Sequence, residues 1–136
     1  MREILFRGKR LDNGEWVEGY LYITHTGTHE IGSYNAETNI ERLASNVIPS
    51  TVGQYTGLKD KNGKRIFEGD IIGSRYDDMY PDDVTIETVK WFRHAWHRKT
   101  MGYDPELIEE DDVLPYSEVI GNIHDNPELL KDGDDG

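Results

Sequence analysis

Hydrophobic and polar residues alternate over the first 23 positions, on both sides of an Asn-Gly pair. The segments 3–11 and 15–23 flank Asn13-Gly14. This dipeptide between two alternating runs is the strongest short-range signal for a β-hairpin. The pattern therefore predicts an N-terminal hairpin.

A two-residue turn fixes the register of this hairpin, because paired residue numbers must then add up to 27. The predicted pairs are Ile4–Ile23 and Phe6–Leu21 on one face, and Leu5–Tyr22, Arg7–Tyr20 and Lys9–Glu18 on the other. Gly8 would face Gly19, where we expect a sharp bend or close packing of the backbones.

A second Asn-Gly pair, Asn62-Gly63, lies at the centre of 52–72 and predicts a second hairpin. A two-residue turn would set Lys61 against Lys64, whose charges repel. A three-residue loop would instead pair Asp60 with Lys64 and Leu58 with Ile66. We favour the longer loop, but the shorter one also gives a favourable pair, Asp60 with Arg65, so the register stays open. Glu68-Gly69-Asp70 then predicts a tight corner before a buried strand.

The remaining pattern is less regular. It predicts strands over 84–92 and 116–123, loops over 24–34 and 74–83, and short helices that begin at Asp104 and Asn126. Both helix starts combine a capping residue with a following Pro and Glu. The segment 37–48 has partly helical spacing and ends at Pro49, so a helix and a strand both fit it.

These elements predict one mainly β domain over residues 1–130. We expect a small, partly open β pseudo-barrel with one or two short capping helices. Residues 131–136 would form a frayed acidic tail.

Composition limits the cellular compartments and the classes of partner that we expect for the protein. The 136 residues contain no cysteine and no run of about 20 apolar residues, so we expect a cytoplasmic protein that is not inserted in a membrane. Residues 104–136 hold 12 acids and one base, which is −11 of the net −12. This concentration of acids opposes general binding to nucleic acid.

One segment nevertheless resembles a nucleic-acid-binding surface. Residues 90–99 interleave cations with aromatic rings, as surfaces that bind single strands do. The candidate binding surface consists of Trp91, Arg93, His97 and Arg98. The alternative is that the aromatic residues belong to the core and the bases pair with the acids after Asp104.

No motif of catalysis or of cofactor binding is present. His94 and His97 lack further metal ligands at a typical spacing, and the acidic residues 77–83 lack the alternation and glycine of a calcium loop. The sequence therefore predicts no catalytic residue, no cofactor and no metal site, which favours a protein that is not an enzyme.

The central segment resembles a known family. Val52-Gly53-Gln54-Tyr55-Thr56-Gly57-Leu58-Lys59-Asp60-Lys61-Asn62-Gly63-Lys64, followed by Ile66-Phe67-Glu68-Gly69-Asp70-Ile71-Ile72, is similar to the signature of the YopX family of phage and prophage proteins. The start at 1–7 and the end at 118–130 are also similar to that family. The resemblance implies a β pseudo-barrel capped by a helix and supplies no catalytic residue.

Together these observations predict a phage or prophage accessory protein that binds a host or phage protein in the bacterial cytoplasm. In one version the acidic residues 104–136 dock on a basic partner. The alternative is a protein that binds single-stranded nucleic acid through 90–99. The sequence leaves homo-oligomerisation open.

Overall fold

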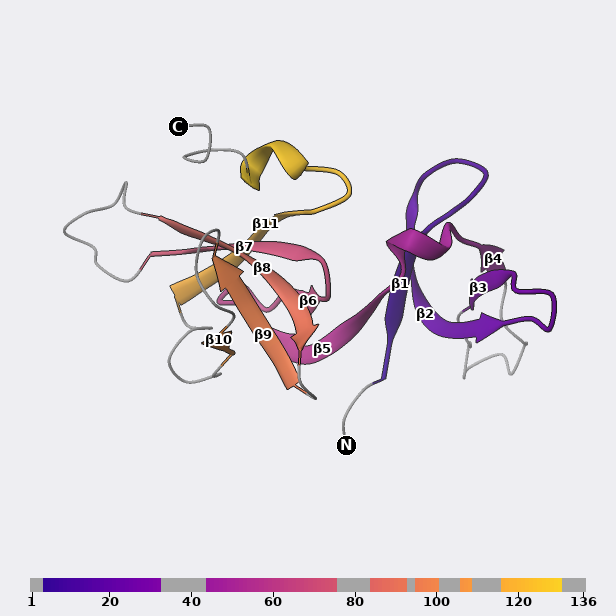
Figure 1. Ribbon diagram of the computed structural model, residues 1–136, viewed down its shortest axis with the longest axis horizontal. Helices are drawn as coiled ribbons and strands as arrows, with labels where there is room; N and C mark the ends of the chain where they lie inside the picture. The colour runs from indigo at the N-terminus through magenta and orange to yellow at the C-terminus, as the bar shows by residue number, and fades with distance from the viewer. Residues whose placement is uncertain are drawn as a thin grey trace. The chain divides into compact units, whose positions relative to one another are not determined.

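The computed structural model describes residues 4–32, 44–75, 84–92, 95–100, 106–108 and 116–130 (Figure 1). Its strands are β1 (Phe6–Lys9), β2 (Trp16–Ile23), β3 (His29–Gly32), β4 (Ala44–Asn46), β5 (Gly53–Lys59), β6 (Arg65–Phe67), β7 (Asp70–Ser74), β8 (Thr85–Phe92), β9 (Ala95–Thr100), β10 (Glu106–Leu107) and β11 (Ser117–Asn122). The described residues also include the 3-10 turns η1 (Pro49–Thr51) and η3 (Pro127–Leu130). The prediction of a mainly β protein is confirmed.

The strands form two sheets, in the orders β4-β3-β2-β1-β5-β6 and β10-β9-β8-β7-β11. Neither order returns to its first strand in the part of the chain that the structure describes, which fits a partly open fold. The chain groups into two compact units, Met1–Tyr55 and Thr56–Gly136. Strand β5 runs through the boundary between them, so no linker separates the units.

In the first unit, the β1–β2 hairpin forms as predicted but in a different register. Directly paired residue numbers add up to 25 rather than 27, as in Phe6 with Gly19 and Lys9 with Trp16. The predicted partners, including Ile4–Ile23 and Phe6–Leu21, are therefore wrong. Because the difference is an even number of residues, every side chain keeps its predicted face.

The register of the hairpin differs because its turn contains four residues rather than two. The Arg10 N–H donates to the Glu15 carbonyl at 2.8 Å, which leaves residues 11–14 in the loop. The Arg10 guanidinium binds the Asp12 carboxylate at 2.8 and 3.1 Å, and Asn13 Oδ1 accepts from the Glu15 N–H. These local side-chain bonds stabilise the wider loop.

The two glycines of the hairpin do not face each other, but both lie at sites of close packing, as predicted. A Cβ atom on Gly19 would lie 2.2 Å from the Gly32 carbonyl oxygen, and one on Gly8 would lie 3.1 Å from the Val47 Cβ. The absence of side chains there lets Ile31 and Val47, two buried residues of this unit, pack on the hairpin.

Two further segments of the first unit contain strands, β3 and β4. The predicted loop 24–34 is wrong in part, because β3 lies within it and pairs with the second half of β2. Its sequence, His-Glu-Ile-Gly, contains one large apolar residue and shows no alternation, so only the pairing defines this strand. The ambiguous segment 37–48 contains the strand β4, whereas residues 37–43 lie outside the described part of the chain.

In the second unit, the predicted three-residue loop is confirmed. The Asp60 N–H donates to the Lys64 carbonyl at 2.8 Å, and Gly63 has the left-handed φ of 81° that the loop requires. The predicted corner at Glu68-Gly69-Asp70 is also present, where Asp70 Oδ2 accepts from the Phe67 N–H at 2.7 Å.

The core of the second unit joins residues from five of its segments. Ile66, Ile72, Val89, Trp96 and Ile108 form the buried cluster. Leu58 and Val119 pack against it. Strands β8 and β11 lie where the sequence predicts them.

One predicted helix is wrong. Glu106–Leu107 form strand β10, which pairs with β9 through Glu106–Arg98 and Leu107–His97. Pairing with β9 outweighs the local capping signal at Asp104, because an edge partner supplies the backbone hydrogen bonds that a short helix would have made. The second predicted helix is present as the short turn η3.

Candidate binding surfaces

Residues 90–92 of the basic-aromatic segment belong to β8, and residues 95–99 belong to β9. Trp91 pairs with Trp96, and His97 pairs with Lys90 across the two strands. Arg93 lies outside the described residues, as does the side chain of Trp91. His97 and Arg98 are half-buried on β9.

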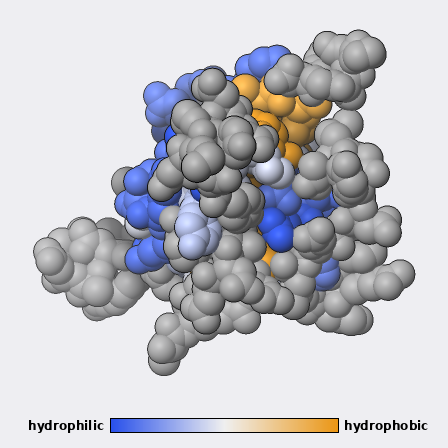
Figure 2. Space-filling view, turned by 90° about the vertical axis from the view of Figure 1, so that its left-hand side faces the viewer, coloured by the Kyte–Doolittle hydropathy of each residue, from blue (hydrophilic) through white to orange (hydrophobic). Residues whose placement is uncertain are grey.

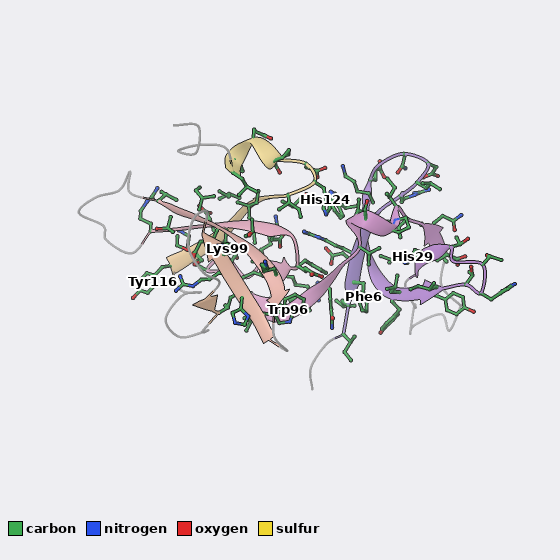
Figure 3. The ribbon with its side chains drawn as sticks, in the orientation of Figure 1. Phe6, His29, Trp96, Lys99, Tyr116 and His124 are labelled. Carbon is green, nitrogen blue, oxygen red and sulfur yellow. The ribbon has the colours of Figure 1, made fainter. Side chains whose placement is uncertain are left out.

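Two residues of this segment have structural contacts. The Trp96 side chain belongs to the core cluster and is 8% exposed (Figure 3). The Arg98 guanidinium lies 3.4 Å from the carboxylate of the buried Glu87. A nucleic-acid surface needs exposed rings and cations that are available to phosphates, so Trp96 and Arg98 add little to one. The surface of Trp91, Arg93, His97 and Arg98 stays a prediction.

The buried acids of the second unit have structural partners. Asp60 is 7% exposed, and its carboxylate accepts hydrogen bonds from the backbone N–H groups of Asn62, Lys64 and Val119, each at 2.9 Å. The carboxylate therefore fixes the turn after β5 and attaches β11 to it. Asp70 holds the corner before β7 in the same way. These contacts explain two acids of the central motif without a catalytic role.

A group of exposed apolar side chains lies over β7. Val84 and Ile120 approach Gly73 from either side, and each would touch a Cβ atom placed there at 3.3–3.4 Å. Ile123 approaches Gly69 at the other end of the strand, at 3.7 Å. All three are between 36 and 40% exposed. We call these three residues the apolar surface. Figure 2 colours one face of the molecule by hydropathy and shows both hydrophobic and hydrophilic residues on it.

Ile120 is exposed because β11 is irregular at this point. The pairing of β11 with β7 shifts between Val119 and Gly121, which leaves Ile120 as the extra residue of a β-bulge. Sequence reasoning missed this surface. The available signal was the adjacent pair Val119-Ile120, which breaks the alternation expected of a strand with one buried face.

The segment that supplies Ile120 and Ile123 carries only negative charges. Residues 116–130 contain Glu118, Asp125 and Glu128 and neither Lys nor Arg. Asp125 and Glu128 are exposed, and Glu118 is half-buried beside Asn62, whose side-chain amide donates to it at 3.3 Å. An apolar centre with a charged rim is the usual anatomy of a protein interface.

The first unit contains a cavity of about 360 Å³, between the β1–β2 loop and β4. Its lining includes the Arg10–Asp12 ion pair, so the guanidinium is already bound by a carboxylate. Among the described residues, no three His, Asp or Glu side chains gather as metal ligands would. No helix in the same residues is long and apolar enough to cross a membrane.

Comparison with known proteins identifies the family. A family model described as YopX protein matches residues 5–131. The chain belongs to the YopX family. The match confirms the resemblance drawn from the central motif, and it includes residues of both compact units.

The fold of this YopX member has a solved counterpart. The crystal structure of protein EF1440 from Enterococcus faecalis superimposes with a TM-score of 0.65 and 23% sequence identity, over 96% of this chain and 99% of that one. At this identity the likeness shows the fold alone. No curated protein matches the sequence.

Proposed function

We propose that this YopX protein is a phage or prophage accessory protein that acts by binding a basic host or phage protein in the bacterial cytoplasm. The observation that carries the proposal is the apolar surface of Val84, Ile120 and Ile123, together with the acids of 116–130. The apolar centre would supply the buried part of the contact. The acids would select a positively charged partner and accelerate its association.

Charge over the whole chain supports a basic partner. Residues 104–136 carry a net charge of −11, whereas residues 1–103 carry −1. The described part of this acidic segment contributes β11, which also pairs with β7 in the core sheet. Deleting the segment would therefore unfold the second unit, and point variants are needed to test the surface.

The test compares three forms of the full chain as baits in a host lysate. Ile120→Asp places a charge in the apolar surface, and Ile4→Asp places the same charge at a 60%-exposed position of the other unit. We expect wild type and Ile4→Asp to retain the same basic protein, and Ile120→Asp to lose it. Retention should also fall as salt rises, because rim charges are screened.

Several outcomes would count against the proposal. These are equal capture by all three baits, loss of a partner that is not basic, and capture that salt does not change. Circular dichroism of each bait shows whether Ile120→Asp is folded, and Glu128→Lys provides a second variant at an exposed position. Reproducible turnover of a small metabolite would argue for an enzyme instead.

The alternative, binding of single-stranded nucleic acid through 90–99, is tested separately. Fluorescence anisotropy with an oligonucleotide at low salt should show salt-dependent binding at roughly tens of micromolar if the alternative holds. That binding should be lost in Arg93→Ala and His97→Ala.

A further inference from the structure

One face of the β1–β2–β3 sheet in the first unit carries aromatic and charged side chains. Alternate residues share a face, and directly paired residues project to the same side. We call this set the aromatic face: Arg7, Lys9, Trp16, Glu18, Tyr20, Tyr22 and Glu30. Tyr20 and Tyr22 are 54 and 52% exposed. The opposite face of the sheet carries Gly8, Gly19 and the buried Ile31.

The cations of this face are held in place by Trp16. The Arg7 guanidinium carbon lies 4.8 Å from the centre of the Trp16 ring, and the Lys9 ammonium lies 5.7 Å from it. Both distances are those of cation–π contacts. Side chains that are ordered before binding lose less conformational entropy when a partner arrives.

The charges of the aromatic face are balanced, unlike those of the chain. The face has two cations and two acids, whereas the chain has 15 bases and 27 acids. A nucleic acid would therefore gain no net attraction from it. Trp, Tyr and Arg are the residue types that contribute most to binding between proteins.

The two ends of the face differ in charge. Lys9 pairs with Trp16 at one end, and Glu30 pairs with Tyr22 at the other. Trp16 and Tyr22 are six positions apart along β2, or roughly 20 Å. A two-fold axis near Tyr20 would place the cationic end of one copy on the Tyr22–Glu30 end of another. A symmetric dimer requires such a self-complementary surface.

The distribution of charge along the chain also favours contact through the first unit. Residues 1–55 contain 5 bases and 7 acids, a net charge of −2, and residues 56–136 contain 10 bases and 20 acids, a net charge of −10. Repulsion between copies therefore arises mainly from the second part of the sequence. We propose that the aromatic face is the contact surface of a homodimer, with the Lys9–Trp16 end of each copy on the Tyr22–Glu30 end of the other.

The experiment measures the mass of the full chain in solution by analytical ultracentrifugation over a range of concentrations. We expect wild type to dimerise. Tyr20→Glu, which places two acids at the axis, should weaken the dimer roughly tenfold or more, or about 1.4 kcal/mol. Glu15→Lys, an exposed change outside the face, should leave it unchanged. Circular dichroism confirms that each variant is folded.

Exchanging the charges of Lys9 and Glu30 tests the proposed orientation of the two copies directly. Lys9→Glu and Glu30→Lys should each weaken self-association, because each creates two like-charged contacts in a symmetric dimer. Mixing the two variants should restore a dimer, since both contacts of the mixed pair then join opposite charges. A monomeric wild type, an unaffected Tyr20→Glu or a mixture that stays monomeric would overturn the proposal. A monomer whose binding to a single-stranded oligonucleotide requires Tyr20 would assign the face to nucleic acid instead.

Discussion

The carboxylate of Asp60 makes a prediction that the structure allows to be worked out in detail. It accepts three backbone hydrogen bonds at 2.9 Å, from Asn62 and Lys64 in the turn and from Val119 in β11. Bonds to an ionised acceptor contribute about 1.5–3 kcal/mol each. The donors in the turn belong to exposed residues, so water can replace the carboxylate there. The Val119 donor is half-buried and has less access to water.

Asp60→Asn should therefore destabilise the second unit by about 1.5–3 kcal/mol. An asparagine can keep one oxygen on the two N–H groups of the turn, but its amide nitrogen then meets the N–H of Val119. Asp60→Ala removes all three acceptors and should cost more, about 2–4 kcal/mol, because water replaces only part of them. Out of a typical stability of about 5–15 kcal/mol, either loss is large.

Urea unfolding followed by tryptophan fluorescence measures the effect, since Trp96 lies in the core of this unit. Glu15→Gln, which removes the charge of an exposed acid in the other unit, is the matched control. Hydrogen exchange of the Val119 amide adds a local readout, which should become faster in Asp60→Asn. Equal unfolding free energies for Asp60→Asn and Glu15→Gln, with unchanged exchange at Val119, would refute this role of Asp60.

Three further predictions follow from packing. Gly19→Ala should destabilise the β2–β3 pairing by about 1–3 kcal/mol, because its Cβ would meet the Gly32 carbonyl oxygen at 2.2 Å. Thermal unfolding measures this loss, and an unchanged midpoint would contradict the close approach. Gly121→Ala should cost a similar amount, since its Cβ would lie 2.5 Å from Asn126 Oδ1; a chemical-shift change confined to residue 121 would count against it. Ile72→Ala should cost about 2–5 kcal/mol, whereas Ile120→Ala should cost less than about 1 kcal/mol, because Ile72 is fully buried and Ile120 is 36% exposed. Similar losses in urea unfolding would show that Ile120 is a core residue and not part of a binding surface.

The candidate surfaces depend on strand pairing that could not be predicted from the sequence. Residue type predicts a binding surface of Trp91, Arg93, His97 and Arg98, whereas Trp96 of the same segment belongs to the core. The aromatic face was present in the sequence as alternating residues of β2. Its partners on β1 depend on the hairpin register, which the sequence placed two residues away. The apolar surface depends on a bulge at Ile120, whose position is defined by pairing with β7.

The sequence by itself determined the properties that depend on neighbouring residues. Alternation and Asn-Gly turns predicted the hairpins and the mainly β class. The repulsion of two lysines favoured the three-residue loop at Asn62-Gly63, and the hydrogen bond from the Asp60 N–H to the Lys64 carbonyl then decided its register. The long central motif identified the YopX family. The first turn is wider because of local side-chain bonds, such as Arg10–Asp12, which the hydrophobic pattern does not record. Tertiary structure alone decided which partner each strand has. It made strand β3 from four residues without a pattern, and it replaced the helix predicted after Asp104 with β10. The physical reason is that backbone hydrogen bonds between strands join residues far apart in the chain, so no local pattern records them.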